Sequence, residues 1–264
     1  MSHAGAEGPA GGQNRPSPAG SRKHAWVNHP VHGPLPALLL VLTVATGVVD
    51  AVSILALGRV FVANMTGNVV FIGFALAGAP GFSLIASLLA LAGFLLGAAV
   101  CAPVINRWRE TRIRLLAVVA TAELILLAGA TAVAASSGEP LHQTPQNVVA
   151  VVAATALGLQ NAAARELAVP DATTTVLTMT LTGFAADLSR GNADAVLRRL
   201  LAVAAMLGGA VTGAELVLHR STTWAMGLSV ALVAVVCCGA WVRGSRPGPG
   251  QTPVQPTYGG QKRP

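Results

Sequence analysis

Two sets of polar residues lie within apolar stretches of this chain and repeat roughly 110 residues apart. Each set begins with a Gly-x-x-(Asp or Asn)-Ala motif, continues with amides and hydroxyls, and ends with Gly-Phe-Ala. Such groups are costly inside a lipid bilayer, so two matched clusters of them predict a functional site. The sets are Gly47 to Ala51, Asn64 to Asn68 and Gly73 to Ala75 in the first half, and Gly158 to Ala162, Thr173 to Thr180 and Gly183 to Ala185 in the second.

The side chains of these sets have the chemistry to coordinate a solute, an ion or a proton. The candidates for binding or for lining a pathway are Asp50, Asn64, Thr66, Asn68, Asn161, Thr174 and Thr178. Asn64 and Asn68 are four residues apart, a spacing that places two amides on one helical face. An equally weighted alternative is that the amides bond backbone groups left free where a segment turns back. For the threonines, helix bending and packing are favoured over lining a pathway.

Two carboxylates are candidates for proton coupling. Asp50 is the acidic residue of the repeated motifs, and its counterpart Asn161 is neutral. Glu123 lies near the middle of an apolar stretch, where an ionised side chain costs roughly 2.5 to 3.5 kcal/mol on insertion scales. We therefore expect Glu123 to be protonated, paired or directed into a cavity. Arg165 is the candidate counter-charge, but its neighbour Glu166 favours a boundary pair at the membrane surface.

The sequence carries no recognisable catalytic, cofactor-binding or metal-binding motif. The three cysteines have no metal-site spacing, and the six histidines lie in predicted tails or loops. The net charge of +7 comes largely from arginines beside apolar stretches. This distribution is typical of membrane topology rather than of nucleic-acid binding. We therefore predict a protein that is not an enzyme and has no cofactor, no metal and no nucleic-acid partner.

Composition predicts an integral membrane protein. Hydrophobic residues make up 53% of the chain and charged residues 10%, and the mean hydropathy is +0.63. Residues 1–34 and 243–264 are rich in glycine and proline and offer no apolar run to pack, so we expect disordered tails. Residues 35–242 form one predicted transmembrane domain, for which the lipid bilayer is the first partner.

The apolar stretches predict an all-α fold with six transmembrane helices and two shorter segments. The stretches are 35–57, 60–78, 82–103, 113–135, 147–168, 172–188, 197–218 and 221–241. A span needs about 20 mostly apolar residues, and 60–78 and 172–188 are the short ones. If these two are re-entrant or short helical segments, the basic turn at 107–114 and both termini lie in the cytoplasm. We therefore expect a multi-pass protein of the bacterial inner membrane.

This topology makes the halves of the domain, about 35–135 and 147–241, an inverted repeat of the 3+3 type. Each half carries a pair of glycines four residues apart in its third element, Gly93 with Gly97 and Gly209 with Gly213. Such pairs allow helix backbones to approach closely. Inverted repeats with interrupted helices are a recurrent way of building a solute pathway at the membrane midplane.

The run from Gly58 to Phe71, together with Gly158 to Asn161 and Thr173 to Thr175, resembles the YoaK-type family of bacterial membrane proteins. The Asn-Met-Thr-Gly-Asn box at 64–68 is the most specific part of the likeness, which covers roughly residues 37–242. The resemblance implies a six-span inner-membrane protein. The family is catalogued as a domain of unknown function, so the resemblance implies no substrate and no catalytic residues.

The sequence thus predicts a secondary transporter or channel for a small solute, with proton coupling as a further hypothesis. The alternative is a non-transporting membrane scaffold or regulatory protein, whose polar groups only hold its segments together. A homo-oligomer is compatible with either. The sequence does not name the solute or the coupling ion.

Overall fold

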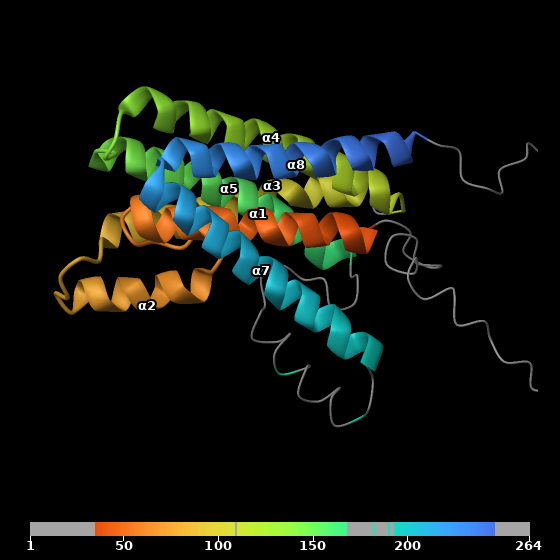
Figure 1. Cartoon of the computed structure of the whole chain (residues 1–264), viewed down its shortest axis with the longest axis horizontal. Coiled ribbons are helices and arrows are strands. Elements are labelled where there is room, and N and C mark those ends of the chain that lie inside the picture. Colours follow the sequence, from red (N-terminus) through yellow and green to blue (C-terminus); the bar gives the residue numbers. More distant parts are fainter. Residues whose placement is uncertain (1–34, 109, 168–181, 183–189, 191–192, 246–264) are drawn as a thin grey trace, which may run out of the picture.

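The computed structural model describes residues 35–108, 110–167, 182, 190 and 193–245. All regular elements in these ranges are α-helices (Figure 1). Six helices are long and apolar enough to cross a membrane, which confirms the predicted all-α membrane fold. They are α1 Leu35–Ala56, α3 Leu84–Trp108, α4 Arg112–Ser137, α5 Gln143–Leu167, α7 Ala193–His219 and α8 Thr222–Gly244.

Local signals set the ends of several helices. Gly138 has a φ of 71° and follows the last residue of α4, because glycine adopts this left-handed conformation without steric cost. The Ser221 hydroxyl accepts a hydrogen bond from the backbone N–H of Trp224 at 3.3 Å and so caps the start of α8. Polar residues extend some helices beyond the apolar stretches. α3, for example, continues through Pro103 to Trp108.

The short helix α2, Met65–Leu76, occupies the first of the two short segments. At 1.5 Å per residue its 12 residues extend about 18 Å. The hydrocarbon core of a bilayer is about 30 Å thick, so α2 does not cross it alone. In Figure 1, α2 lies beside one end of the bundle, and its contacts with other helices are mainly to α3. The second short segment, 172–188, lies outside the described residues apart from Thr182.

Glycines bring α3 and α5 into backbone contact. A Cβ atom added to Gly93 would meet the carbonyl oxygen of Val151, and one added to Gly97 would meet the backbone of Thr155 and Leu159. Neither position has room for a side chain. Because later residues of α3 meet later residues of α5, the two helices run parallel.

Helices α1 and α7, which also come from different halves of the chain, make the same kind of close backbone contact at glycines. A Cβ atom on Gly209 would meet the backbone of Val44, and one on Gly213 would meet that of Val48. These helices are therefore parallel as well, and α7 crosses α1 obliquely (Figure 1).

Helices α4 and α8 are antiparallel, because Gly244 at the end of α8 lies against Arg114 at the start of α4. The short turns from α3 to α4, α4 to α5 and α7 to α8 reverse direction at each step. Helices α1, α4 and α7 therefore begin on one face of the bundle, here called the first face, and end on the second face. α3 begins where α1 ends. Residues 57–83 thus connect the end of α1 to the start of α3, both of which lie on the second face. The end of α5 and the start of α7 lie on the first face.

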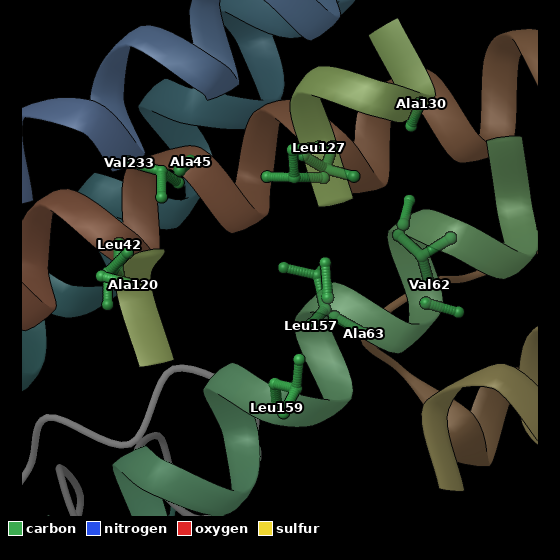
Figure 2. Close-up of a cluster of buried hydrophobic side chains, with 14 of the residues drawn as sticks. Leu42, Ala45, Val62, Ala63, Ala120, Leu127, Ala130, Leu157, Leu159 and Val233 are labelled. Carbon is green, nitrogen blue, oxygen red and sulfur yellow. The ribbon is translucent and has the colours of Figure 1, made fainter. Parts of the chain in front are cut away.

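The apolar core lies between α1, α4, α5 and α8, and the loop at residues 57–64 also enters it (Figure 2). α1 is the most enclosed of the spans. The residues that Figure 2 labels are Leu42, Ala45, Val62, Ala63, Ala120, Leu127, Ala130, Leu157, Leu159 and Val233. Many large apolar side chains on α3 and α7 are exposed instead, as expected for surfaces that face lipid.

Candidate functional site

Asp50 lies on α1, and its buried carboxylate meets the loop that returns into the bundle. Its Oδ1 accepts a hydrogen bond from the backbone N–H of Ala63 at 3.3 Å. Only 8% of Asp50 is exposed. A loop buried beside a membrane helix needs partners for its peptide groups, and this carboxylate is one of them. Asp50 therefore holds the 57–64 loop against α1.

Asn68 joins the same loop to α2. Its side-chain Nδ2 donates to the carbonyl oxygen of Phe61 at 2.6 Å, and its Oδ1 accepts from the backbone N–H of Phe61 at 2.8 Å. The residue is completely buried. The amide thus replaces the partner that a neighbouring strand would give to Phe61. This arrangement matches the alternative in which amides satisfy backbone groups of a turning segment.

Asn64 and Thr66 are exposed, so they do not share a buried face with Asn68. The backbone N–H of Asn68 donates to the carbonyl oxygen of Asn64 at 3.4 Å, one helical turn apart, but the exposed Asn64 and the buried Asn68 have different surroundings. Asn64 is the N-cap of α2, and its Oδ1 accepts from the backbone N–H of Gly67 at 3.4 Å. The combination of asparagine and a following apolar run is the signal that predicts a cap.

An aromatic cluster packs around this junction. The rings of Phe61 and Phe71 are stacked with centroids 5.5 Å apart, and Phe82 lies 5.0 Å from Phe71 and 5.2 Å from Phe74. A Cβ atom on Gly67 would stand 2.5 Å from the Phe61 ring, so glycine is required there for the ring to lie against α2. The cluster and the Asn68 amide together fix the position of the loop relative to α2.

A second polar contact joins α1 to α5 in the middle of the bundle. Gln160 Nε2 donates to Thr46 Oγ1 at 3.0 Å, and Thr46 donates in turn to the carbonyl oxygen of Leu42 at 2.9 Å. Both side chains are buried. Gln160 is not among the site residues predicted from the sequence, although a glutamine beside Asn161 in an apolar helix is an available signal. Asn161 itself is half-buried on the same helix.

Thr43, Thr46, Asp50 and Ser53 form a buried polar stripe along α1. Their spacing of three and four residues places them on one helical face. The hydroxyls of Thr43 and Ser53 bond carbonyl oxygens of α1 itself, those of Leu39 and Asp50. The stripe connects the Thr46 contact with α5 to the Asp50 contact with the 57–64 loop. It is therefore the candidate polar route through the described part of the bundle.

Glu123 on α4 is completely buried, and neither carboxyl oxygen has a hydrogen-bond partner within the described ranges. Its neighbours one helical turn away, Val119, Ala120 and Leu127, are buried apolar residues. Burying a polar group without a hydrogen bond is costly. Of the outcomes expected for Glu123, pairing is not observed among the described residues. Arg165, the proposed counter-charge, is exposed at the end of α5.

Thr174 and Thr178 lie outside the described residues, so the described contribution of the second half to the candidate site comes from Gln160 and Asn161 on α5. Within the described ranges there is also no group of three or more His, Cys, Asp or Glu residues placed to hold a metal ion. What the described site offers is a buried carboxylate, a buried amide and a buried glutamine on the enclosed helices, with an unpartnered carboxyl group on α4.

Six apolar helices around buried polar side chains define a multi-pass α-helical membrane protein. The chain belongs to the family described as Protein of unknown function (DUF1275), whose model matches residues 38–239. It is 32% identical over 152 residues to the UPF0700 transmembrane protein YoaK of Bacillus subtilis (strain 168). That alignment covers 58% of this chain and 66% of the relative, slightly less than two thirds of its length. No solved structure matches the chain. The family resemblance seen in the sequence is thereby confirmed.

Proposed function

We propose that this protein is a secondary transporter or channel for a small solute in a bacterial inner membrane. The observation that carries the proposal is the buried polar stripe on α1, which leads from Thr46 to Asp50 and the returning 57–64 loop. Polar groups inside a membrane bundle are costly and typically mark solute or ion pathways. Interrupted segments at membrane depth are tolerated where they are buried in protein or line a cavity.

The positions of the arginines support cytoplasmic N- and C-termini. The first face carries Arg107, Arg112, Arg114, Arg165, Arg190, Arg198, Arg199 and Arg243, whereas the second carries Arg59 and Arg220 among the described residues. Arginine-rich loops remain on the cytoplasmic side during insertion. We accordingly propose that the first face, where α1 begins and α8 ends, is cytoplasmic. Reporter fusions at residue 110 and at residue 140 should give cytoplasmic and external signals, respectively, and the reverse result would invert the model.

The helix contacts support an inverted repeat. Gly209 against Val44 joins α7 to α1, and Gly93 against Val151 joins α3 to α5. If α5 corresponds to α1 and α7 to α3, the α7–α1 and α3–α5 contacts are equivalent, and the two helix pairs run in opposite directions across the membrane. Such halves exchange access between two faces by rocking against each other. This symmetry supports a carrier more than a static pore.

Asp50, Asn64, Thr66 and Asn68 have different proposed roles within the pathway. Asp50 and Asn68 bond the backbone of the 57–64 loop and position it. Asn64 and Thr66 are exposed at the start of α2 and are the side chains available to a solute. Asn161, Thr174 and Thr178 are the proposed contributors from the second half. Glu123 and Asp50 remain the candidates for proton coupling.

The alternative function is a membrane scaffold or regulatory protein that moves no solute. Its support comes from the bonds just described, because Asp50, Asn64 and Asn68 all bond backbone groups. Re-entrant backbone requires such partners in any membrane protein. Under this alternative, the polar residues contribute to stability alone.

Reconstituted vesicles distinguish the two functions. The purified protein is placed in proteoliposomes, and uptake is measured for a panel of amino acids, organic acids and monovalent cations. We expect uptake above protein-free vesicles, reduced by Thr66→Ala but not by Thr212→Ala. Thr212 is a matched control, because it is exposed on α7 and bonds the carbonyl oxygen of Gly208. Equal uptake by both variants would remove Thr66 from the pathway, and no uptake of any solute by folded protein would favour the scaffold.

A further inference from the structure

Two guanidinium groups flank one indole ring where α3 ends and α4 begins. The Cζ atom of Arg107 lies 5.0 Å from the ring centroid of Trp108, and that of Arg114 lies 5.8 Å from it. Both arginines are exposed, and Trp108 is half-buried. A guanidinium over an aromatic ring is held by the ring quadrupole while its N–H edge stays available for another partner. The indole therefore keeps two exposed cations close together.

The end of α8 completes this corner of the first face. A Cβ atom on Gly244 would lie 3.6 Å from Arg114 Cγ, which places the neighbouring Arg243 at the same end of the bundle. Trp241 is 48% exposed, and its Nε1 donates to Thr121 Oγ1 on α4 at 3.0 Å. The corner thus combines three arginines with two tryptophans from the ends of α3 and α8 and the start of α4. We call these five residues the Arg–Trp corner.

The charge at this corner is not neutralised within the described part of the chain. No described carboxylate pairs with Arg107 or Arg114. Glu110 is the acidic residue of the described turn between α3 and α4. Two neighbouring guanidinium groups with free N–H donors match the oxygens of a phosphate group. The corner therefore lacks an anionic partner.

The position of the corner identifies which phosphate would reach it. Tryptophans are enriched where a membrane protein meets the headgroup region, and basic clusters at helix ends recognise acidic lipid headgroups. Exposed apolar side chains continue from the corner along the bundle, with Val100 on α3 52% exposed and Val242 on α8 57% exposed. These surfaces suit acyl chains. A free phosphate ion would use only the polar half of this surface.

We propose that the Arg–Trp corner binds the phosphodiester headgroup of an anionic phospholipid, with Arg107 and Arg114 as its main ligands. The bound lipid neutralises this corner and ties the α3–α4 turn to the end of α8. The inference is independent of solute transport, since it concerns residues outside the candidate pathway.

Binding is measured with the full-length protein in a neutral detergent, by titration with phosphatidylglycerol or phosphatidylcholine and detection by native mass spectrometry. Phosphatidylglycerol should bind preferentially, and the double variant Arg107→Gln with Arg114→Gln should bind it about tenfold more weakly, a loss of roughly 1.4 kcal/mol. Arg165→Gln is the matched control, because Arg165 is exposed on the same face at the end of α5. It should bind as the wild type does. Melting temperatures in detergent alone verify that each variant is folded.

Four results would overturn the proposal, three from the binding measurements and one from competition. The first is equal binding of the two lipids, and the second is an unchanged affinity in the double variant. The third is an equal loss in Arg165→Gln, which would indicate diffuse surface charge instead of a site. Inorganic phosphate and glycerophosphoglycerol, tested as competitors, separate a lipid site from a phosphate site. Neither should displace the lipid at millimolar concentration, and displacement by inorganic phosphate would assign the corner to the free anion.

Discussion

Asp50 and Glu123 are both buried carboxyl groups on membrane-spanning helices, yet their surroundings differ. Asp50 accepts a hydrogen bond from the backbone of Ala63 and holds a returning loop. Glu123 has no hydrogen-bond partner in the described structure and lies on an apolar face of α4. The Asp50 carboxylate stabilises the fold through this bond. Burial of the Glu123 carboxyl group costs free energy that no described hydrogen bond offsets. A costly group without a structural role is the stronger candidate for a functional one.

Asn68→Ala should have the largest effect on stability, because it removes both side-chain partners of the Phe61 backbone. Leaving the part-buried N–H and C=O of Phe61 unsatisfied costs about 1–2 kcal/mol each, the lower part of the range for buried groups, so we expect a loss of about 2–4 kcal/mol in the free energy of unfolding. Unfolding of the purified protein in detergent measures it. Asn64→Ala is the control, since loss of an exposed cap costs about 1 kcal/mol. Similar losses in both variants would mean that Asn68 is not the anchor of the loop.

Glu123→Leu should change stability in the opposite direction. Replacing an unpartnered buried carboxyl group with an apolar side chain of similar size removes a desolvation cost of about 1–3 kcal/mol. We expect the protein to become more stable by that amount and to lose proton-driven uptake. Glu123→Gln keeps the size and polarity, so it should lose the uptake with little gain in stability. A clear destabilisation by Glu123→Leu would indicate bonds to the carboxyl group and would end the contrast with Asp50.

Asp50→Asn tests the other side of the comparison with a smaller expected effect. The amide oxygen of asparagine can still accept from Ala63 N–H, so stability should change by less than about 1.5 kcal/mol. If Asp50 carries the coupled proton, uptake loses its dependence on the pH gradient while solute exchange persists. If the variant keeps full pH-driven uptake, Asp50 is an anchor only and Glu123 becomes the coupling candidate. Uptake with and without an imposed pH gradient distinguishes these outcomes.

Glu139, a carboxylate near the membrane surface, serves as a reference for the two buried groups and is tested by Glu139→Gln. Glu139 accepts hydrogen bonds from the backbone N–H groups of Thr222 and Thr223 at the start of α8. Its charge also favours the positive end of the helix dipole, so we expect a loss of about 0.5–1 kcal/mol. The same unfolding measurement detects it, and added salt should reduce the difference. If Glu139→Gln lost more stability than Asn68→Ala, the surface contact would contribute more than the buried one, contrary to our expectation.

The sequence predicts the spanning helices well because apolar length is a local property. The stretch at 35–57, for example, appears as α1 at Leu35–Ala56. Helix ends are predicted less well, since the stretch at 82–103 becomes a helix that continues to Trp108. Polar residues can extend a helix beyond the apolar run, so hydropathy alone underestimates its length. The seven residues that we selected as pathway candidates remain predictions for binding.

The partners of the buried polar groups could not be predicted, because they are set by tertiary contacts. Gln160 meets Thr46 from a different half of the chain, and no local pattern gives that pairing. Asn68 bonds Phe61 only because the 57–64 loop turns back against α2. The spacing of Asn64 and Asn68 does not predict that the first is an exposed N-cap and the second a buried partner of the loop. The start of α2 at Met65 separates their environments.

The contact between α1 and α7 has a consequence for how the protein is made. Among the described helices α1 is synthesised first, yet the surface around Val44 and Val48 is covered only when Gly209 and Gly213 of α7 have been synthesised. Its Thr43 to Ser53 stripe likewise lacks the Gln160 partner until α5 has emerged, and the Asp50 carboxylate is costly in lipid. The nascent chain must therefore keep α1 beside the insertion machinery or another protein while the later helices emerge. Assembly of this fold is a post-insertion event in which the first helix is among the last to be fully packed.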